Sequence, residues 1–171
     1  LNFADARDPG EADGSGPDVA VVDGWLEDLG GTRRDDLEQG EGFRVNLLVE
    51  AHAHLPAPGI ALELLNVDDV SVLGFGDSLE RDDGSPTPMR AGDRLRVSAE
   101  IDRALVPGRY SVLCSMSRSR EKGDSALRDL RVIEFLVKGR DPMPGMVMVR
   151  ADVRAALETE APAPRAEAPA R

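Results

Sequence analysis

Residues 94–102 read RLRVSAEID and carry the clearest structural signal in the chain. Leu95, Val97, Ala99 and Ile101 alternate with charged or polar residues. This period of two is typical of a strand with one face on a core and the other in water. A helix would repeat its apolar residues every three or four positions, so the spacing excludes a helix here. The segment therefore predicts a half-buried antiparallel strand.

The same alternation recurs along the chain, with Gly, Pro and Asp at the breaks between segments. It is clear in residues 43–52 (FRVNLLVEAH), 60–64 (IALEL) and 109–117 (RYSVLCSMS). Residues 19–28 and 70–76 predict two further strands, and Gly24 in the first of these predicts a bulge before Trp25. Many short strands separated by turn residues favour an all-β sandwich or barrel.

Two segments are apolar on both phases: residues 130–137 (LRVIEFLV) and 146–149 (MVMV). Such strands must be covered on two sides, by a second sheet and by something else, for which a partner subunit is one candidate. The best helix candidate is short, from Asp152 to Glu160, with Asp152 as its cap and Pro162 beyond its end.

The two ends differ in composition from the segments between them. Residues 1–17 are rich in Gly, Pro, Ala and acid and predict a flexible acidic linker, while residues 154–171 predict a short helix or a disordered Pro/Ala-rich tail. The globular body is expected over residues 18–153. A basic start followed by an apolar run is not visible at Leu1, so no signal peptide is expected.

The net charge of -11 argues against nucleic acid and anionic membranes as partners, because both bind clustered Lys and Arg. No apolar stretch approaches the roughly 18 residues of a membrane-spanning helix. A single cysteine allows no internal disulfide, which is consistent with a reducing compartment. Cys114 shares the inward phase of Val112, so a buried and inert thiol is expected.

Catalytic and metal-binding motifs are missing from the sequence. It has no phosphate-binding G-x-x-x-x-G-K-[ST] loop, no G-x-S-x-G elbow and no H-E-x-x-H. His52 and His54 form an H-x-H pair that lacks the further ligands of a cupin-type metal site, so surface histidines are expected instead. Acid pairs such as Asp68-Asp69 are interpreted as solvated turns. We expect no metal, no cofactor and no enzyme activity.

The order of the strand segments adds information that no single motif carries. The runs PGIALELLNVDDVSVLGFGDS (58–78), MRAGDRLRVSAEIDRALVPGRYSVLCSMSR (89–118), ALRDLRVIEFLVKG (126–139) and PGMVMVRADV (144–153) follow one another. Together they resemble the C-terminal carbohydrate-binding domain of the ATP-binding subunit of O-antigen-type polysaccharide ABC exporters, the Wzt type. The pieces that carry the resemblance are Gly74-Phe75-Gly76, Gly108-Arg109-Tyr110, Asp129 with Phe135 and Val137, and the strand from Gly145.

The resemblance implies an immunoglobulin-like or jelly-roll β-sandwich of about eight strands. It also implies a homodimer that exchanges its C-terminal strand and binds the terminus of a lipid-linked polysaccharide on the cytoplasmic side of the cell membrane before export. The same resemblance implies an upstream ATPase domain that contacts the membrane subunit of the transporter.

A sugar-binding surface commonly pairs an aromatic ring with polar side chains that bind hydroxyl groups. Core packing is the alternative for both Trp25 and Tyr110. The hypothesis is a non-catalytic glycan-recognition domain whose candidate contacts are Trp25, Arg44, Asn46, Glu50, His52, Ser115, Ser117 and Arg118. The rival hypothesis is a ligand-free sandwich used for dimerisation or for docking a transporter partner. An enzyme with two carboxylates facing each other across a cleft is a distant third.

Overall fold

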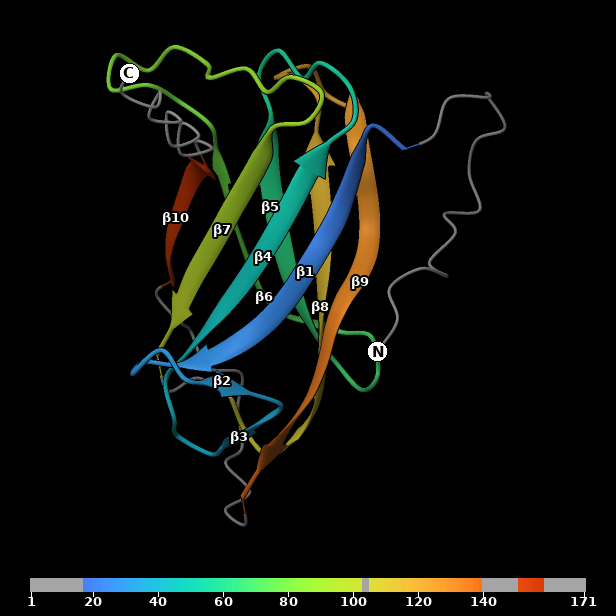
Figure 1. The fold of residues 1–171 in the computed structure, drawn as a ribbon. Helices are drawn as coiled ribbons and strands as arrows, with labels where there is room; N and C mark the ends of the chain where they lie inside the picture. Colours follow the sequence, from blue (N-terminus) through green and yellow to red (C-terminus); the bar gives the residue numbers. More distant parts are fainter. Residues whose placement is uncertain (1–16, 103–104, 140–150, 159–171) are drawn as a thin grey trace, which may run out of the picture.

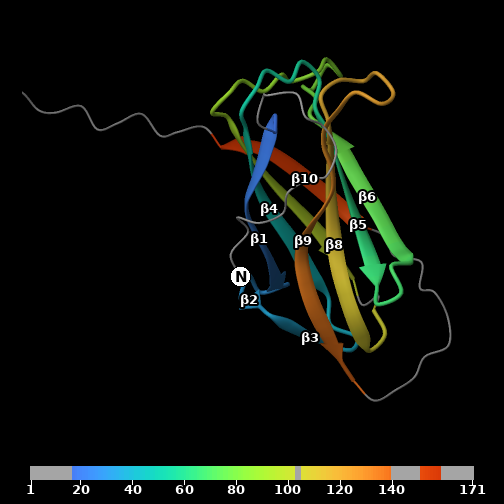
Figure 2. The same cartoon turned by 90° about the vertical axis from the view of Figure 1, so that its right-hand side faces the viewer.

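A computed structural model describes residues 17–102, 105–139 and 151–158 of the chain. These residues form two five-stranded sheets that pack face to face (Figures 1 and 2). Sheet 1 has the order β10 (Ala151–Glu158), β7 (Arg94–Ile101), β4 (Phe43–Ala51), β1 (Val19–Asp28), β2 (Arg33–Arg34). Sheet 2 has the order β3 (Asp36–Glu38), β9 (Ser125–Lys138), β8 (Gly108–Ser117), β5 (Gly59–Asn66), β6 (Ser71–Ser78).

All neighbouring strands are antiparallel except β3, which pairs in parallel with β9. The predicted all-β sandwich is confirmed, and within the described residues the long strands match the expected segments closely. None of the described segments forms a helix of the length and apolar character that crossing a bilayer requires.

The core lies between the sheets and is built from the inward phase of each strand. The alternating residues that predicted β7 and β4 are buried, including Leu95, Val97, Phe43 and Val45. Phe135 of β9 bridges the layers, because its ring lies 5.8 Å from the ring of Phe43 and 5.7 Å from that of Tyr110. Tyr110 is therefore a core residue, and its hydroxyl donates to the carbonyl oxygen of Val106 at 2.9 Å.

The helix predicted from Asp152 to Glu160 is wrong as far as the structure describes it. Residues 151–158 form β10, which pairs with β7 from Ala151 opposite Ile101 to Glu158 opposite Arg94. This pairing fills the edge of sheet 1 and satisfies backbone groups that an exposed edge strand would leave open. Tertiary pairing has outweighed the helix propensity of Ala, Leu and Glu. The expected strand at 146–149 and most of both termini lie outside the described residues.

The bulge in β1 was predicted at Gly24 but lies earlier, where the register with β4 shifts between Val21 and Asp23. Gly24 itself points inward at a close approach of the two sheets. A Cβ atom on Gly24 would lie 3.0 Å from Cδ2 of Leu47 and 3.3 Å from the carbonyl oxygen of Val132 in β9. The glycine therefore sets the distance between β1 and β9.

Strand β9 was expected to be covered on both faces. In one copy of the chain only its inner face is covered, by Val132, Phe135 and Val137, whereas Leu136 on the outer phase is exposed. A cover for the outer face would have to come from elsewhere.

Candidate functional site

The sequence-predicted contact residues fall on two opposite faces of the sandwich. Trp25, Arg44, Asn46 and Glu50 occupy the outward phase of sheet 1. By contrast, β8 with Ser115 and Ser117 belongs to sheet 2. His52 and Arg118 follow the ends of β4 and β8 at the loop end of the domain. The predicted set is therefore not one site.

The charged residues on sheet 1 are engaged with their neighbours across the strands. Nε of Arg44 donates to Oε2 of Glu100 at 3.0 Å, and Nε of Arg94 donates to Oε2 of Glu50 at 2.8 Å. These are cross-strand ion pairs of the kind that stabilise a solvated sheet face. Their polar groups are already used within the sheet.

Trp25 is not an open platform for a ligand. Its side chain lies under the guanidinium groups of Arg33 and Arg96, whose Cζ atoms lie 4.4 and 5.3 Å from the ring centroid. Its Nε1 donates to Oε1 of Glu27 at 2.6 Å. Asn46, opposite Trp25 in the register, was expected as an outward contact but is buried.

A groove of about 630 Å³ crosses the outer face of sheet 2 at the end of the domain where β8 finishes, which we call the loop end. Its floor is made of two cross-strand rows, Gly76–Ala61–Ser115 and Ser78–Gly59–Ser117, because these residues face each other across β6, β5 and β8. Small side chains at these positions leave the face hollow. We call this the small-residue groove; its lining residues are Gly59, Ile60, Ala61, Gly76, Asp77, Ser78, Glu80, Ser115, Met116, Ser117, Glu121, Gly123, Asp124 and Ser125.

Two of the predicted residues, Ser115 and Ser117, line this groove. Ser115 Oγ donates to Oδ1 of Asp129 at 2.9 Å and accepts the Asp129 N–H at 3.0 Å. Ser117 Oγ accepts the N–H of Gly59 at 3.1 Å. Each hydroxyl oxygen keeps acceptor capacity, since a serine hydroxyl has one donor and two lone pairs. The groove thus presents fixed hydroxyl groups.

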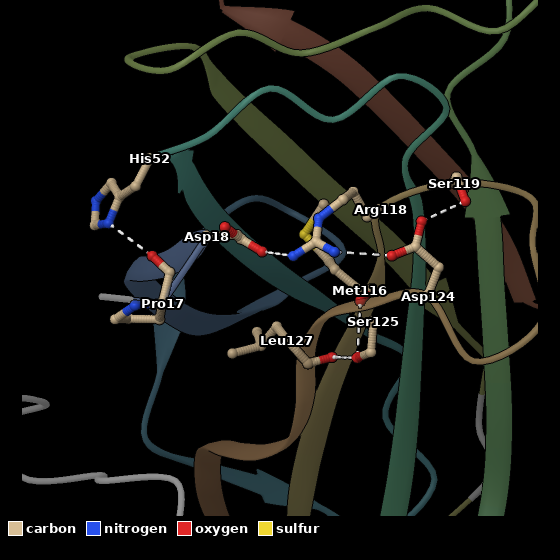
Figure 3. A network of polar contacts seen from close by, with 9 residues as sticks. All are labelled: Pro17, Asp18, His52, Met116, Arg118, Ser119, Asp124, Ser125 and Leu127. Carbon is tan, nitrogen blue, oxygen red and sulfur yellow. Dashed lines mark hydrogen bonds and ion pairs between the residues drawn. The ribbon is translucent and has the colours of Figure 1, made fainter. Parts of the chain in front are cut away.

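Arg118 does not line the groove but holds the loop that does (Figure 3). Its guanidinium forms ion pairs with Asp18, just before β1, and with Asp124, at 2.9 Å in the second case. Hydrogen bonding to Asp18, more than the neighbouring Asp124, raises the pKa of Arg118. Asp124 also accepts from the hydroxyl of Ser119. The contacts fix a carboxylate at the rim of the groove.

The acidic rim residues Asp77, Glu80, Glu121 and Asp124 were not predicted as contacts. Two of them are neutralised by arginines, since Arg118 pairs with Asp124 and Arg120 with Glu80 at 2.6 Å. The sequence does hold a signal for the floor, because small residues repeat on one phase of GIALEL and GFGDS. That signal gains meaning only once the strands are known to be neighbours.

The two histidines lie in the loop after β4 and contact different parts of the chain. Nδ1 of His52 lies 3.2 Å from the carbonyl oxygen of Pro17, and Nδ1 of His54 lies 3.1 Å from that of Met89 (Figure 3 shows His52). Within residues 17–102, 105–139 and 151–158, no group of three or more His, Cys, Asp or Glu side chains is placed to hold a metal ion.

Comparison with known proteins gives a family assignment. The family model described as "Wzt C-terminal domain" matches residues 14–148. The chain belongs to the Wzt C-terminal domain family. Among solved structures, the crystal structure of the C-terminal domain of Wzt superposes with a TM-score of 0.63 at 14% identity, covering 77% of this chain and 80% of that one. This Wzt likeness confirms the sandwich fold.

Two further structures align less well. β-D-Mannosidase from Dictyoglomus thermophilum gives a TM-score of 0.41 at 11% identity, covering 70% of this chain and 13% of the enzyme. Pseudomonas fluorescens alkylpurine DNA glycosylase AlkC, bound to DNA, gives a TM-score of 0.43 at 14% identity, covering 72% of this chain and 31% of the glycosylase. Neither likeness is close enough to carry an argument. A comparison with curated proteins gives no significant match.

Membership makes this Wzt domain part of the ATP-binding subunit type of O-antigen ABC exporters, and specifically the part that is not the ATPase. The resemblance seen in the sequence is thereby confirmed.

Proposed function

We propose that this Wzt domain recognises a polysaccharide without catalysing a reaction on it, and that the small-residue groove holds the glycan. The observation that carries the proposal is the hollow across β6, β5 and β8, floored by glycine, alanine and serine. A sugar chain needs room and polar groups that bind its hydroxyl groups, and the groove offers both. The family assignment supports the polysaccharide as the ligand class.

The charge of the groove favours a neutral, hydroxyl-rich ligand. Carboxylates accept hydrogen bonds from hydroxyl groups, and such charge-assisted bonds are stronger than neutral ones. Asp77 and Glu121 have no arginine partner among the described contacts, while no lysine or arginine lines the groove. An anionic sugar would meet uncompensated negative charge there. We therefore expect a polysaccharide terminus without uronic acid or phosphate groups.

The cellular setting follows the family. In the proposed role, the domain belongs to an ATPase subunit at the inner face of the cell membrane, on the cytoplasmic side. There it would bind the terminus of a lipid-linked O-antigen-type polysaccharide before export through the membrane subunit. The acidic segment 1–17 would act as the linker from the ATPase domain.

A homodimer through the C-terminal strands forms part of the same proposal. Strand β10 is an edge strand held to the sandwich by its ladder with β7, so the same ladder accepts β10 from a second copy. Sedimentation equilibrium on the full chain and on a chain ending at Gly139 tests this. A dimer that survives removal of β10 would contradict strand exchange.

The ligand-free alternative has one observation in its favour: no aromatic side chain is among the residues that line the small-residue groove. Under that alternative the domain dimerises or docks a transporter partner, and the groove stays empty. The two hypotheses differ in one measurable quantity, the affinity for glycan.

Titration calorimetry with the polysaccharide of the source cells, freed of its lipid, separates the two. Ala61 is exposed on the groove floor, so Ala61→Phe should fill the groove and abolish binding in it. Glu63 is the next outward position of β5 and lies outside the lining, so Glu63→Phe is the matched control and should bind like the wild type. No heat at millimolar ligand, or equal binding by both variants, would refute the groove as the glycan site.

A further inference from the structure

The Trp25 cluster lies on the outer face of sheet 1, on the opposite side of the sandwich from the small-residue groove. We define it as Trp25, Arg33, Asn46, Arg96 and Ser98. The register places Trp25, Asn46 and Ser98 in one row across β1, β4 and β7. Trp25 is 9% exposed as a residue, and its Nε1 donates a hydrogen bond to Glu27. The ring is thus held in a fixed orientation under two arginines.

Asn46 is the unusual member of this cluster. The residue is 4% exposed, and its Nδ2 is buried without a hydrogen-bond partner among the described residues. A buried amide donor without a partner destabilises the fold, and an apolar side chain of similar size would not. A polar group that costs stability and has no structural partner is a pointer to a binding site.

The cover over the indole is weakly held. The Arg33 side chain is 61% exposed, and its only described ion pair is with Asp23, which is 39% exposed. Exposed ion pairs and exposed cation–π contacts each contribute little to stability. Arg33 can therefore be displaced from the ring at low cost, whereas Arg96, whose Cζ lies 5.3 Å from the ring centroid, stays over the indole.

A larger groove, of about 800 Å³, is lined by Trp25 and Arg33 of the cluster together with Arg34, Ile133 and Arg109, while Asn46 lies beside it and is not among its lining residues. It offers room for further units of a chain whose one unit lies on the indole. Aromatic rings stack well on the apolar face of a pyranose, and the remaining requirement is an oxygen acceptor for Asn46.

We propose that the Trp25 cluster is a second saccharide-binding site, in which a pyranose ring replaces Arg33 on the indole and one of its oxygens accepts a hydrogen bond from Asn46 Nδ2. The ligand class rests on the proposed function, but the cluster shares no residue with the small-residue groove. An experiment can therefore refute one of the two sites without refuting the other.

Trp25 is the only tryptophan of the chain, so intrinsic fluorescence reports on this site alone. The probes are methyl α-D-mannopyranoside, methyl β-D-glucopyranoside and methyl β-D-galactopyranoside, titrated to about 0.1 M because single sugars bind in the millimolar range. At least one should change the Trp25 emission saturably, while glycerol at equal concentration should not. No saturable change with any of them overturns the proposal.

Asn46→Leu separates a ligand contact from a structural role. If Nδ2 binds the sugar, the variant should lose about tenfold or more in affinity, equal to about 1.4 kcal/mol, while its urea midpoint stays equal or rises. An unchanged Trp25 response in a folded Asn46→Leu protein overturns the proposal. Arg33→Gln should increase acrylamide quenching of Trp25 and strengthen sugar binding, because the cover no longer competes; weaker binding would overturn the displacement of Arg33.

Ala61→Phe provides the comparison with the proposed function. It should leave the Trp25 response to the pyranosides unchanged while abolishing polysaccharide binding in the small-residue groove. If the Trp25 emission does not change with the pyranosides while the groove still binds polysaccharide, only the second site is refuted. If the Trp25 emission changes but the groove binds no polysaccharide, only the groove is refuted.

Discussion

Asp18 and Arg118 lie a hundred positions apart in the chain and form an ion pair at the loop end of the sandwich. Asp18 stands immediately before β1, and its backbone oxygen accepts the N–H groups of His52 and Ala53. Arg118 stands after β8 and also binds Asp124 on the rim of the small-residue groove. The entry of the chain into the domain is thereby joined to the loop that shapes the groove.

Arg118→Gln should remove both ion pairs and loosen the loop 118–125. Because the Arg118 side chain is partly exposed, the expected loss in the free energy of unfolding is only about 1 kcal/mol, measured by urea denaturation. Glycan affinity should fall severalfold, since Asp124 is no longer fixed. Arg90→Gln, an exposed arginine away from the groove lining, is the control. Equal affinity in the two variants would show that the loop keeps its shape without Arg118.

Gly76→Ala should destabilise the domain by about 1–3 kcal/mol, because β6 must shift. A Cβ atom on Gly76 would lie 2.5 Å from the carbonyl oxygen of Ile60 and 3.2 Å from Cα of Ala61. Gly74 is the matched control, two residues earlier in β6, since a Cβ there meets nothing within 4 Å. Gly74→Ala should be neutral or slightly stabilising. Equal urea midpoints for the two variants would contradict this account of the groove floor.

Asp36 and Lys138 make part of the stability depend on pH. The hydrogen bond from Nζ of Lys138, at 2.7 Å, lowers the pKa of Asp36 below its ordinary value of 3.8. A carboxyl whose pKa is lower in the folded state than in the unfolded state stabilises the fold at any pH above its unfolded-state pKa. This stabilisation is lost as the pH falls through its folded-state pKa. Lys138→Met should therefore be less stable than the wild type near neutral pH, with the difference vanishing in acid.

The measurement for this pair is the urea midpoint from about pH 6 down to about pH 2, the range over which carboxyls protonate. Lys122→Met is the control, because Lys122 is the other lysine of the chain and is exposed in the loop before β9. A constant difference between Lys138→Met and the wild type across the range would show that Asp36 is not the partner that matters.

Cys114 should be unreactive in the folded protein. The thiol is 0% exposed, and burial raises its pKa to about 12, so the thiolate needed for alkylation is not formed at pH 8. Iodoacetamide should label the chain in concentrated urea and not without it. Cys114→Ser should cost about 1–3 kcal/mol by burying a hydroxyl, and more than Cys114→Ala. Rapid labelling of the native protein would mean that β8 opens locally.

Local pattern alone was sufficient for most strands of this domain. Leu95, Val97, Ala99 and Ile101 repeat every second residue, and a strand with one buried face is the only regular structure that puts all four inside. The same holds for β4 and β8. For β10, residues 151–158 also alternate, Val153, Ala155 and Leu157 against Asp152, Arg154 and Glu158, but the Ala, Leu and Glu residues among them favour a helix, so the local pattern is ambiguous.

The candidate sites depended on which strands are neighbours. The outward phase of a strand indicates only that a side chain points away from the core, so Arg44 and Ser115 looked equivalent although they lie on opposite sheets. The floor of the small-residue groove exists because Gly76, Ala61 and Ser115 face one another from three strands. The small residues repeat on one phase of each strand, but the sequence does not show that these phases form one surface.

The sequence by itself determined the fold class and the family of this protein, because period-two patterning and the order of its segments are local and sequential properties. Tertiary structure alone decided that Trp25 is covered by arginines, that Nδ2 of Asn46 is buried without a hydrogen-bond partner among the described residues, and that Arg118 joins the start of the domain to the groove. Each of these depends on contacts between strands far apart in the chain, and such contacts are set by sheet order and packing, which the spacing of residues along one strand does not encode.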